Sequence, residues 1–292
     1  MIIKTINTLD KKTIDEIRQA EQVCNEHDGL KGSIHLDTSF NFTDKISSVF
    51  IGYEDTRIVS VLSMFIPTIK EAEVYGFTLP GFRRRNNFKA LLSQAIQELL
   101  EHGIKNILFV VESQSSSGIA LAAGLGGCYV KTEYLMTHTG AGSGFSESRK
   151  FRSILTSPGE ASIDELAKMR QAIFNDNYEV TKEILSKIIN HDNCHQYCSE
   201  YEGTRIGLGS AYFDQQKASI YGLGIIPEYQ AKGFGIELLV LMIKDLARRG
   251  FETIEIEVES NNENALKLYK KCGFEITCAY EYHSLVNELG MS

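Results

Sequence analysis

Hydrophobic and polar positions follow two periods along the chain, one typical of β-strands and one typical of α-helices. The clearest strand is Thr253 to Glu259, where apolar and acidic residues alternate and therefore occupy opposite faces. Further strands are predicted at 2–6, 46–53, 57–66, 73–79, 151–156, 194–201, 205–213, 217–226 and 275–286. Helices are predicted at 13–26, 163–174, 179–190, 234–249 and after residue 262, and residues 31–45 are interpreted as helix and loop. This mixture predicts an α/β fold.

An internal repeat divides this pattern into two halves. A shift of 147 positions aligns, without a gap, Pro80 with Pro227, Gly103 with Gly250, and Gly126 with Gly273. We therefore predict two copies of one α/β fold, at residues 1–139 and 150–292, joined by a flexible Gly/Ser-rich linker at 140–149. Little chain remains after the final predicted strand. The second copy is therefore expected to lack its last strand or to receive it from 151–156.

A glycine-containing loop separates the predicted strand 217–226 from the predicted helix 234–249. It reads Gln230-Ala231-Lys232-Gly233-Phe234-Gly235. Glycines allow the backbone to approach a ligand closely, and the free N–H groups of a first helical turn favour an anion. The loop has neither the three glycines of a dinucleotide site nor the Gly-Lys-Ser/Thr of a Walker loop. A structural turn with small residues for packing is the alternative.

A second motif follows at a fixed distance. It is Asn262-x-x-Ala265-x-x-Leu268-Tyr269-x-x-x-Gly273-Phe274, and the first motif in full is Pro227-x-x-Gln230-x-x-Gly233-x-Gly235. Together they resemble the two motifs of the GNAT acetyltransferase superfamily, and over nearly its whole length the chain resembles tandem members with one degenerate half. The resemblance implies two tandem GNAT-like domains, each a mixed twisted sheet flanked by helices. It also implies that strands 217–226 and 253–259 splay apart to admit the pantetheine arm of acetyl-CoA.

The resemblance further implies which residues contact acetyl-CoA as a co-substrate. These are Ile225, Ile226, Gln230, Ala231, Lys232, Gly233, Phe234, Gly235, Ile236, Asn262 and Ala265. A strand bulge is implied at or near Ile225, with a backbone N–H that meets the carbonyl oxygen of the acyl group. Asn262 is expected chiefly to cap the following helix.

Acyl transfer to an amine needs a group that accepts the amine proton and a group that protonates the leaving thiolate. Glu257 is the candidate base, because its Ile-Glu-Val context resembles the base-bearing strand of ribosomal-protein N-terminal acetyltransferases. Glu255, a water chain, or a merely solvated row of glutamates are the alternatives. Tyr269 is the candidate acid, and its alternative is an aromatic ring packed beside Phe274. Cys272 as a covalent nucleophile is disfavoured, since no histidine lies close in the sequence.

The predicted function is N-acetyl transfer from acetyl-CoA to a primary amine of a small molecule or peptide, by direct attack. A non-catalytic, CoA-binding regulatory protein and an acyltransferase that uses longer acyl groups are the alternatives. The identity of the amine is not readable from the sequence.

The first half differs where this chemistry would occur. Asn86 and Phe88 replace the two loop glycines, Ala122 replaces Tyr269, and Val110 replaces Glu257. We therefore expect that this half has lost catalysis and that side chains fill its loop site. Its Arg83-Arg84-Arg85 run either holds a phosphate or forms a solvated basic turn.

Net charge and composition limit the classes of binding partner that we expect. The net charge of −8 disfavours nucleic acid and acidic membranes, and no apolar run reaches 18 residues. Six scattered cysteines fit free thiols, so a cytoplasmic location is expected. A zinc site among His191, Cys194, His195 and Cys198 is disfavoured, because strand alternation separates neighbouring side chains. Homodimer formation remains open.

Overall fold

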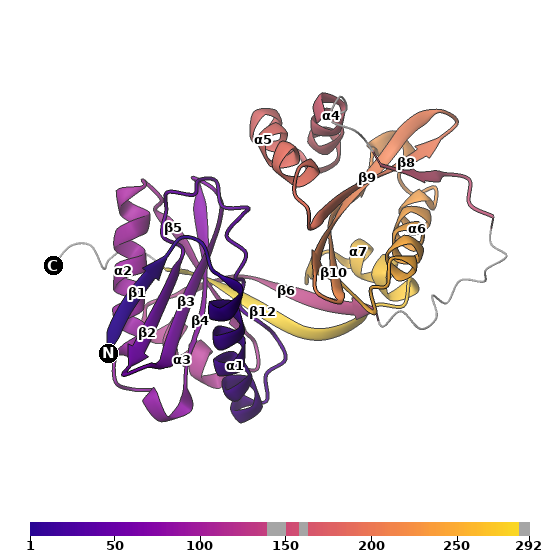
Figure 1. Ribbon diagram of the computed structural model, residues 1–292. Helices are drawn as coiled ribbons and strands as arrows, with labels where there is room; N and C mark the ends of the chain where they lie inside the picture. Colours follow the sequence, from indigo (N-terminus) through magenta and orange to yellow (C-terminus); the bar gives the residue numbers. More distant parts are fainter. Residues whose placement is uncertain (139–149, 158–162, 286–292) are drawn as a thin grey trace. The chain divides into compact units, whose positions relative to one another are not determined.

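The computed structural model describes residues 1–138, 150–157 and 163–285 of the chain (Figure 1). The predicted linker at 140–149 lies outside the described residues. The chain forms two compact units. Unit 1 contains residues 1–132 and 278–285, and unit 2 contains the described residues between 133 and 277.

Unit 1 is a mixed sheet with a helix on each face. Its elements are β1 (Ile2–Ile6), α1 (Lys11–Asp28), β2 (Val49–Glu54), β3 (Arg57–Thr68), β4 (Glu71–Thr78), α2 (Asn87–Glu101), β5 (Asn106–Glu112), α3 (Ser116–Gly124) and parts of β6 (Cys128–His138) and β12 (Glu275–Leu285). The strand order is β1-β2-β3-β4-β5-β12-β6. Residues 31–45 form no helix, so that part of the prediction is wrong. Backbone N–H groups of this segment instead donate to the carboxylates of Glu112 and Glu21.

Alternation along the strands of unit 1 builds two separate cores. Ile51 and Val61 face α1 and pack with Ile17, whereas Phe50 and Leu62 face α2. Because successive strand residues point to opposite faces, one hairpin supplies both cores.

Unit 2 repeats this plan. Its elements are β7 (Ile154–Thr156), α4 (Ile163–Phe174), α5 (Tyr178–Ile189), β8 (Cys194–Tyr201), β9 (Thr204–Asp214), β10 (Lys217–Ile225), α6 (Phe234–Arg248), β11 (Thr253–Glu259), α7 (Glu263–Lys271) and parts of β6 and β12. Figure 1 shows α4 and α5 together, across the strands from α6. Leu238 and Ile243 of α6 pack on Ile254 and Ile256, while Leu166 of α4 packs on the other face of the sheet. The predicted mixed sheets flanked by helices are confirmed.

The two halves of the sequence exchange their last strands. β6, which ends the first repeat, pairs antiparallel with β11 from Ile254↔His138 to Glu259↔Glu133. β12, which ends the second repeat, pairs antiparallel with β5 from Tyr280↔Glu112 to Leu285↔Ile107. The suggestion that 151–156 supplies a last strand is wrong, because β7 pairs with β8 at the opposite edge. Each compact unit is therefore completed by a strand end from the other half of the sequence.

Candidate active site

The predicted wedge between β10 and β11 is present in unit 2. The two strands pair in parallel from Lys217↔Thr253 to Ile220↔Ile256, and the pairing then stops. Glu257 is the first residue of β11 beyond the last pair. Tyr221 is the corresponding residue of β10, so these two residues mark the apex of the opening.

A β-bulge in β10 begins at this apex. Tyr221 pairs with Ser210 and Gly224 pairs with Leu208, so Gly222 and Leu223 together face a single residue of β9. Gly222 has φ +59°, which favours glycine. The bulge lies just before Ile225, the position near which it was predicted. A bulge turns backbone N–H groups away from the ladder and thus makes them available to a ligand.

Unit 1 differs at the equivalent strand. β4 pairs with β3 in continuous register from Glu73↔Phe65 to Thr78↔Ser60, within the part of the chain that the structure describes. The extra residue of β10 changes the offset between the repeats, because buried Ala72 and buried Ala218 occupy equivalent places 146 positions apart. An alignment of the two repeats at a constant shift of 147 positions does not reveal this insertion.

The loop after β10 is open to solvent and has a defined backbone. A 3₁₀ turn spans Pro227–Tyr229, Ala231 has φ +57°, and Gly233 has φ +88° immediately before α6. Ala231, Lys232 and Gly233 are exposed. No side chain from the described residues caps the start of α6, so its first N–H groups face outward. The loop thus fits a phosphate group.

Two loop side chains that were predicted to contact the cofactor fold back on the protein. Gln230 donates from Nε2 to the Ile225 carbonyl at 2.8 Å, and Lys232 donates from Nζ to the Glu228 carbonyl at 2.8 Å. Both contacts fix the shape of the loop. The backbone N–H groups are therefore the main groups offered to a ligand here.

Sequence reasoning missed Arg152, which braces this loop. Its Nη2 donates to the Lys232 carbonyl at 2.8 Å, and its guanidinium lies over the Phe234 ring at 4.2 Å. The same guanidinium binds the buried carboxylate of Glu237. Burial acts to raise the pKa of Glu237, but hydrogen bonds from Arg152 and from the backbone N–H groups of residues 152 and 153 outweigh it and hold the pKa below its usual value.

The second motif packs against the loop. A Cβ on Gly235 would lie 3.1 Å from Cδ1 of Leu268, so the glycine permits close contact between α6 and α7. Asn262 accepts a hydrogen bond from the Ala265 N–H at 3.1 Å and thereby caps α7, as predicted. Ala265 itself is half-buried.

Tyr269 lies on α7, next to Leu268, and is 8 % exposed. Its ring centroid is 6.1 Å from that of Phe274. Burial raises the pKa of Tyr269 to about 12. The phenol therefore holds its proton at neutral pH and is present there as a hydrogen-bond and proton donor.

The two candidate bases lie on the same acidic face of β11 but have different surroundings. Glu257 is exposed at the apex of the wedge, whereas half-buried Glu255 pairs with Lys217 Nζ at 3.1 Å. Glu257 is also the residue that follows the last β10–β11 pair, whereas Glu255 lies within the paired part of β11. Its position at the opening favours Glu257.

Arg170 of α4 also reaches this region and was not predicted. A Cβ built on Gly222 would lie 2.4 Å from its Nη1, so the guanidinium lies against the bulge. Asp176 holds Arg170 through Nε at 3.0 Å and Nη2 at 2.8 Å. No feature of the local sequence marks this contact.

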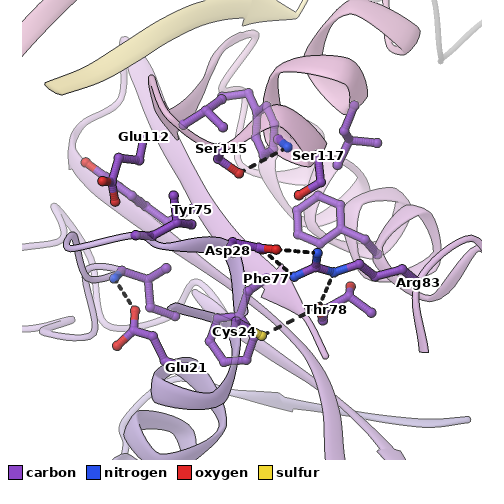
Figure 2. A pocket seen from close by; sticks show the side chains of 18 of the residues that line it. Glu21, Cys24, Asp28, Tyr75, Phe77, Thr78, Arg83, Glu112, Ser115 and Ser117 are labelled. Atoms are coloured by element: carbon purple, nitrogen blue, oxygen red, sulfur yellow. Dashed lines mark hydrogen bonds and ion pairs between the residues drawn. The ribbon is translucent and has the colours of Figure 1, made fainter. Parts of the chain in front are cut away.

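The first half gives an unexpected result. A cavity of about 400 Å³ opens in unit 1 beside the loop that contains Arg83, Arg84 and Asn86 (Figure 2). The expectation that side chains fill this region is wrong. Asn adopts the left-handed conformation more readily than most residues, and Asn86 has φ +60° where Gly233 has +88°.

Two further features limit the alternatives. Within residues 1–138, 150–157 and 163–285, no cluster of three or more His, Cys, Asp or Glu side chains has the geometry of a metal site. None of the helices in the same ranges combines the length and the apolar character that crossing a bilayer requires.

Comparison with known proteins agrees with the geometry. Residues 163–274 match the sequence model of the acetyltransferase (GNAT) family. A GCN5-related N-acetyltransferase from Sphaerobacter thermophilus has a similar structure, with a TM-score of 0.75 and 14 % identity over 97 % of this chain and 94 % of the other. A tandem GNAT protein from the clavulanic acid biosynthesis pathway gives a TM-score of 0.70 and 14 % identity, over 97 % and 98 % of the two chains. A GNAT family acetyltransferase from Colwellia psychrerythraea gives a TM-score of 0.64 and 15 % identity, over 97 % and 99 %.

Residues 163–274 thus match the acetyltransferase (GNAT) family, and the whole chain has the fold of tandem GNAT proteins. The matched family transfers acyl groups from acyl-CoA, so acyl transfer is the general activity that this match supports. At these identities the structural likeness is one of fold, and the acyl group and the acceptor are separate questions.

Proposed function

We propose that this protein is an N-acetyltransferase that moves the acetyl group of acetyl-CoA to a primary amine, with catalysis in unit 2. The observation that carries the proposal is the wedge, where the bulge of β10, the end of its pairing with β11 and the carboxylate of Glu257 occur together. The phosphate-compatible loop follows on the same strand.

The bound thioester supplies the activated acyl group and the thiolate that leaves. Backbone N–H groups from residues 231 to 236 hold the diphosphate, and Gln230 and Arg152 keep that loop in shape. Bulge residues Gly222 and Leu223 direct backbone N–H groups at the carbonyl oxygen and thereby stabilise the charge that develops on it.

Proton transfer completes the reaction. Glu257 accepts a proton from the amine, directly or through a water, so that the nitrogen lone pair attacks the carbonyl carbon. As the C–N bond forms and the C–S bond breaks, Tyr269 donates its phenolic proton to the sulfur. Glu257 then releases the amine proton to solvent and the phenolate takes up a proton from solvent, so the products are the amide and free coenzyme A.

The acceptor is an amine that approaches an acidic protein. The net charge of −8 attracts cations on average and thereby favours small or peptidic amines over anionic acceptors. Arg170 lies against the bulge, where its positive charge would repel a second positive group on the acceptor.

The test is a screen for coenzyme A release. Acetyl-CoA and a longer-chain acyl-CoA are each offered to the wild-type protein with a panel of amino acids, polyamines, aminoglycosides and peptides. Amine-dependent thiol release from acetyl-CoA supports the proposal. Release only from the longer acyl-CoA assigns a different acyl group, and binding of CoA without release on any amine contradicts catalysis.

A further inference from the structure

The acceptor side of the wedge is the face of the sheet that α4 covers. Ile220 of β10 and Ile256 of β11 pair with each other and pack in the core with α6. Because successive strand residues point to opposite faces, the next residues, Tyr221 and Glu257, point toward the α4 side. An amine that transfers its proton to Glu257 therefore enters on this side of the sheet.

Arg170 of α4 lies on the same side, directly against the bulge. Its Nη1 is 2.4 Å from the position of a Cβ built on Gly222. Its guanidinium lies 5.0 Å from the centre of the Phe174 ring, and the Arg170 side chain is 20 % exposed. The cation is thus held beside the bulge, where the thioester carbonyl is expected, and it remains accessible to a small ligand.

Asp176 orients this guanidinium without using all of its donors. One carboxylate oxygen, Oδ2, accepts from Nε of Arg170 at 3.0 Å and lies 2.8 Å from Nη2. A guanidinium has five N–H groups, and these contacts use two of them. Nη1 makes no hydrogen bond to the residues that the structure describes. The edge formed by Nη1 and Nη2 is therefore available, and its two parallel N–H groups match the two oxygens of a carboxylate.

The phenol beside Arg170 adds no charge to this place. Tyr221 donates from its hydroxyl to Sγ of Cys194 at 3.7 Å. Burial raises the pKa of Tyr221 above its usual value, and the opposing effect of Arg170 is smaller. Tyr221 therefore stays neutral at physiological pH. The apex of the wedge then has a proton acceptor on one side, Glu257 of β11, and an anion-binding edge on the other, Arg170 of α4.

We propose that the acceptor is a free amino acid, or another small amine with a carboxylate a few bonds away, and that Arg170 binds this carboxylate. The carboxylate accepts from Nη1 and Nη2, while the amine of the same molecule lies between Glu257 and the thioester carbonyl. Arg170 thus determines acceptor specificity and takes no part in bond making. The acceptor class rests on the proposed function of unit 2. It is compatible with the net charge of −8, because a zwitterion carries no net negative charge that the protein would repel.

The test compares three forms of each acceptor, namely the free amino acid, its carboxamide and the amine that lacks the carboxyl group. Rates of thiol release from acetyl-CoA give kcat and KM for each form. Differences in amine basicity between the forms cancel when a variant is compared with the wild type on the same compound. Arg170→Met removes the guanidinium but keeps an unbranched side chain, and Arg170→Lys keeps the charge without the planar fork. Lys168→Met is the matched control, because Lys168 is an exposed cation on the same helix.

We expect Arg170→Met to lower kcat/KM for free amino acids about 10- to 100-fold, mainly through KM, and to change it for the amides and decarboxylated amines less than about threefold. Arg170→Lys should lie between the two, and Lys168→Met should match the wild type. Equal losses on all three forms would mean that Arg170 only supports the bulge, and they would overturn the proposal. A wild-type enzyme that acetylates the decarboxylated amines but not the amino acids would also overturn it.

A binding measurement distinguishes failure of this proposal from failure of the proposed function. The protein saturated with coenzyme A is titrated with each amino acid and its amide by calorimetry, in the absence of acetyl-CoA. If the protein acetylates nothing but binds the amino acid, and Arg170→Met weakens that binding about tenfold or more, the carboxylate site is supported and catalysis is contradicted. If the protein acetylates amines equally well with and without Arg170, the function is supported and the carboxylate site is contradicted.

Discussion

Arg152 binds Glu237 at two points, with Nε and Nη2 at 2.8 and 2.7 Å from the same carboxylate oxygen, Oε1. The guanidinium is half-exposed and the carboxylate is buried. The pair connects the segment before β7 to the first turn of α6, and Arg152 also binds the loop carbonyl of Lys232. The loop geometry of unit 2 therefore depends on a residue about 80 positions earlier in the chain.

Removing this brace should loosen the loop. Arg152→Ala leaves the Glu237 carboxylate buried without its cation, so we expect a loss of about 1–3 kcal/mol in unit 2 and weaker coenzyme A binding. Hydrogen exchange of the α6 amides measures the stability. Arg248→Ala is the control, because Arg248 is an exposed surface cation that pairs with Asp245 at 3.5 Å and should contribute less than about 1 kcal/mol.

The same pair predicts a pH dependence. The folded-state pKa of Glu237 is lowered, so its stabilisation is complete above the unfolded value of about 4.3 and is lost as the pH falls through the folded value. The difference in stability between wild type and Arg152→Ala should therefore shrink below about pH 4. If the stability difference between the two proteins instead grows as the pH falls, the ion pair of Arg152 with ionised Glu237 is not its source.

The bulge predicts a contrast between two glycines. Gly222→Ala and Gly203→Ala both place a Cβ at positive φ, which costs about 1 kcal/mol each. Only the Gly222 variant also displaces Arg170, since nothing lies within 4 Å of a Cβ on Gly203. We expect similar losses of stability but a loss of kcat/KM, about tenfold or more, in Gly222→Ala alone. If the two variants have equal kcat/KM, the bulge has no role in catalysis.

If Tyr269 is the acid, its substitution should lower kcat without weakening coenzyme A binding. Tyr269→Phe keeps the ring beside Phe274 and removes the acidic proton, so kcat should fall about 10²-fold while coenzyme A affinity changes less than about twofold. Because the pKa of Tyr269 is raised to about 12, wild-type activity should show no loss from its ionisation below about pH 11. If the variant keeps the wild-type kcat, Tyr269 is not the acid and serves only in packing.

The sequence predicts most strands and helices because each has a clear period and a clear end. Thr253 to Glu259 alternates without exception, and the predicted helix 163–174 agrees with the structure at both ends. In the first half, α2, β5, α3 and β6 were not predicted as elements. The partner of β12 was also missed, since equivalent strands carry the same local pattern whichever sheet edge they join.

The parts of the site that escaped prediction depend on contacts distant in sequence or on single residues. Arg152 and Glu237 are charged residues of types that usually lie on the surface, and they are 85 positions apart in the sequence. Only the folded structure brings them into contact. The cavity of unit 1 was missed because glycine loss was taken to mean closure, whereas Asn86 keeps the required backbone conformation.

The most direct measurement is the pH dependence of amine acetylation in Glu257→Gln, compared with Glu255→Gln. We expect Glu257→Gln to lower kcat/KM about 10²-fold or more at neutral pH, and we expect the loss to shrink as rising pH deprotonates the free amine. Glu255→Gln, which removes a carboxylate already paired with Lys217, should have a much smaller effect. Full activity of Glu257→Gln, or a larger loss in Glu255→Gln, would contradict a transfer site at the apex of the wedge.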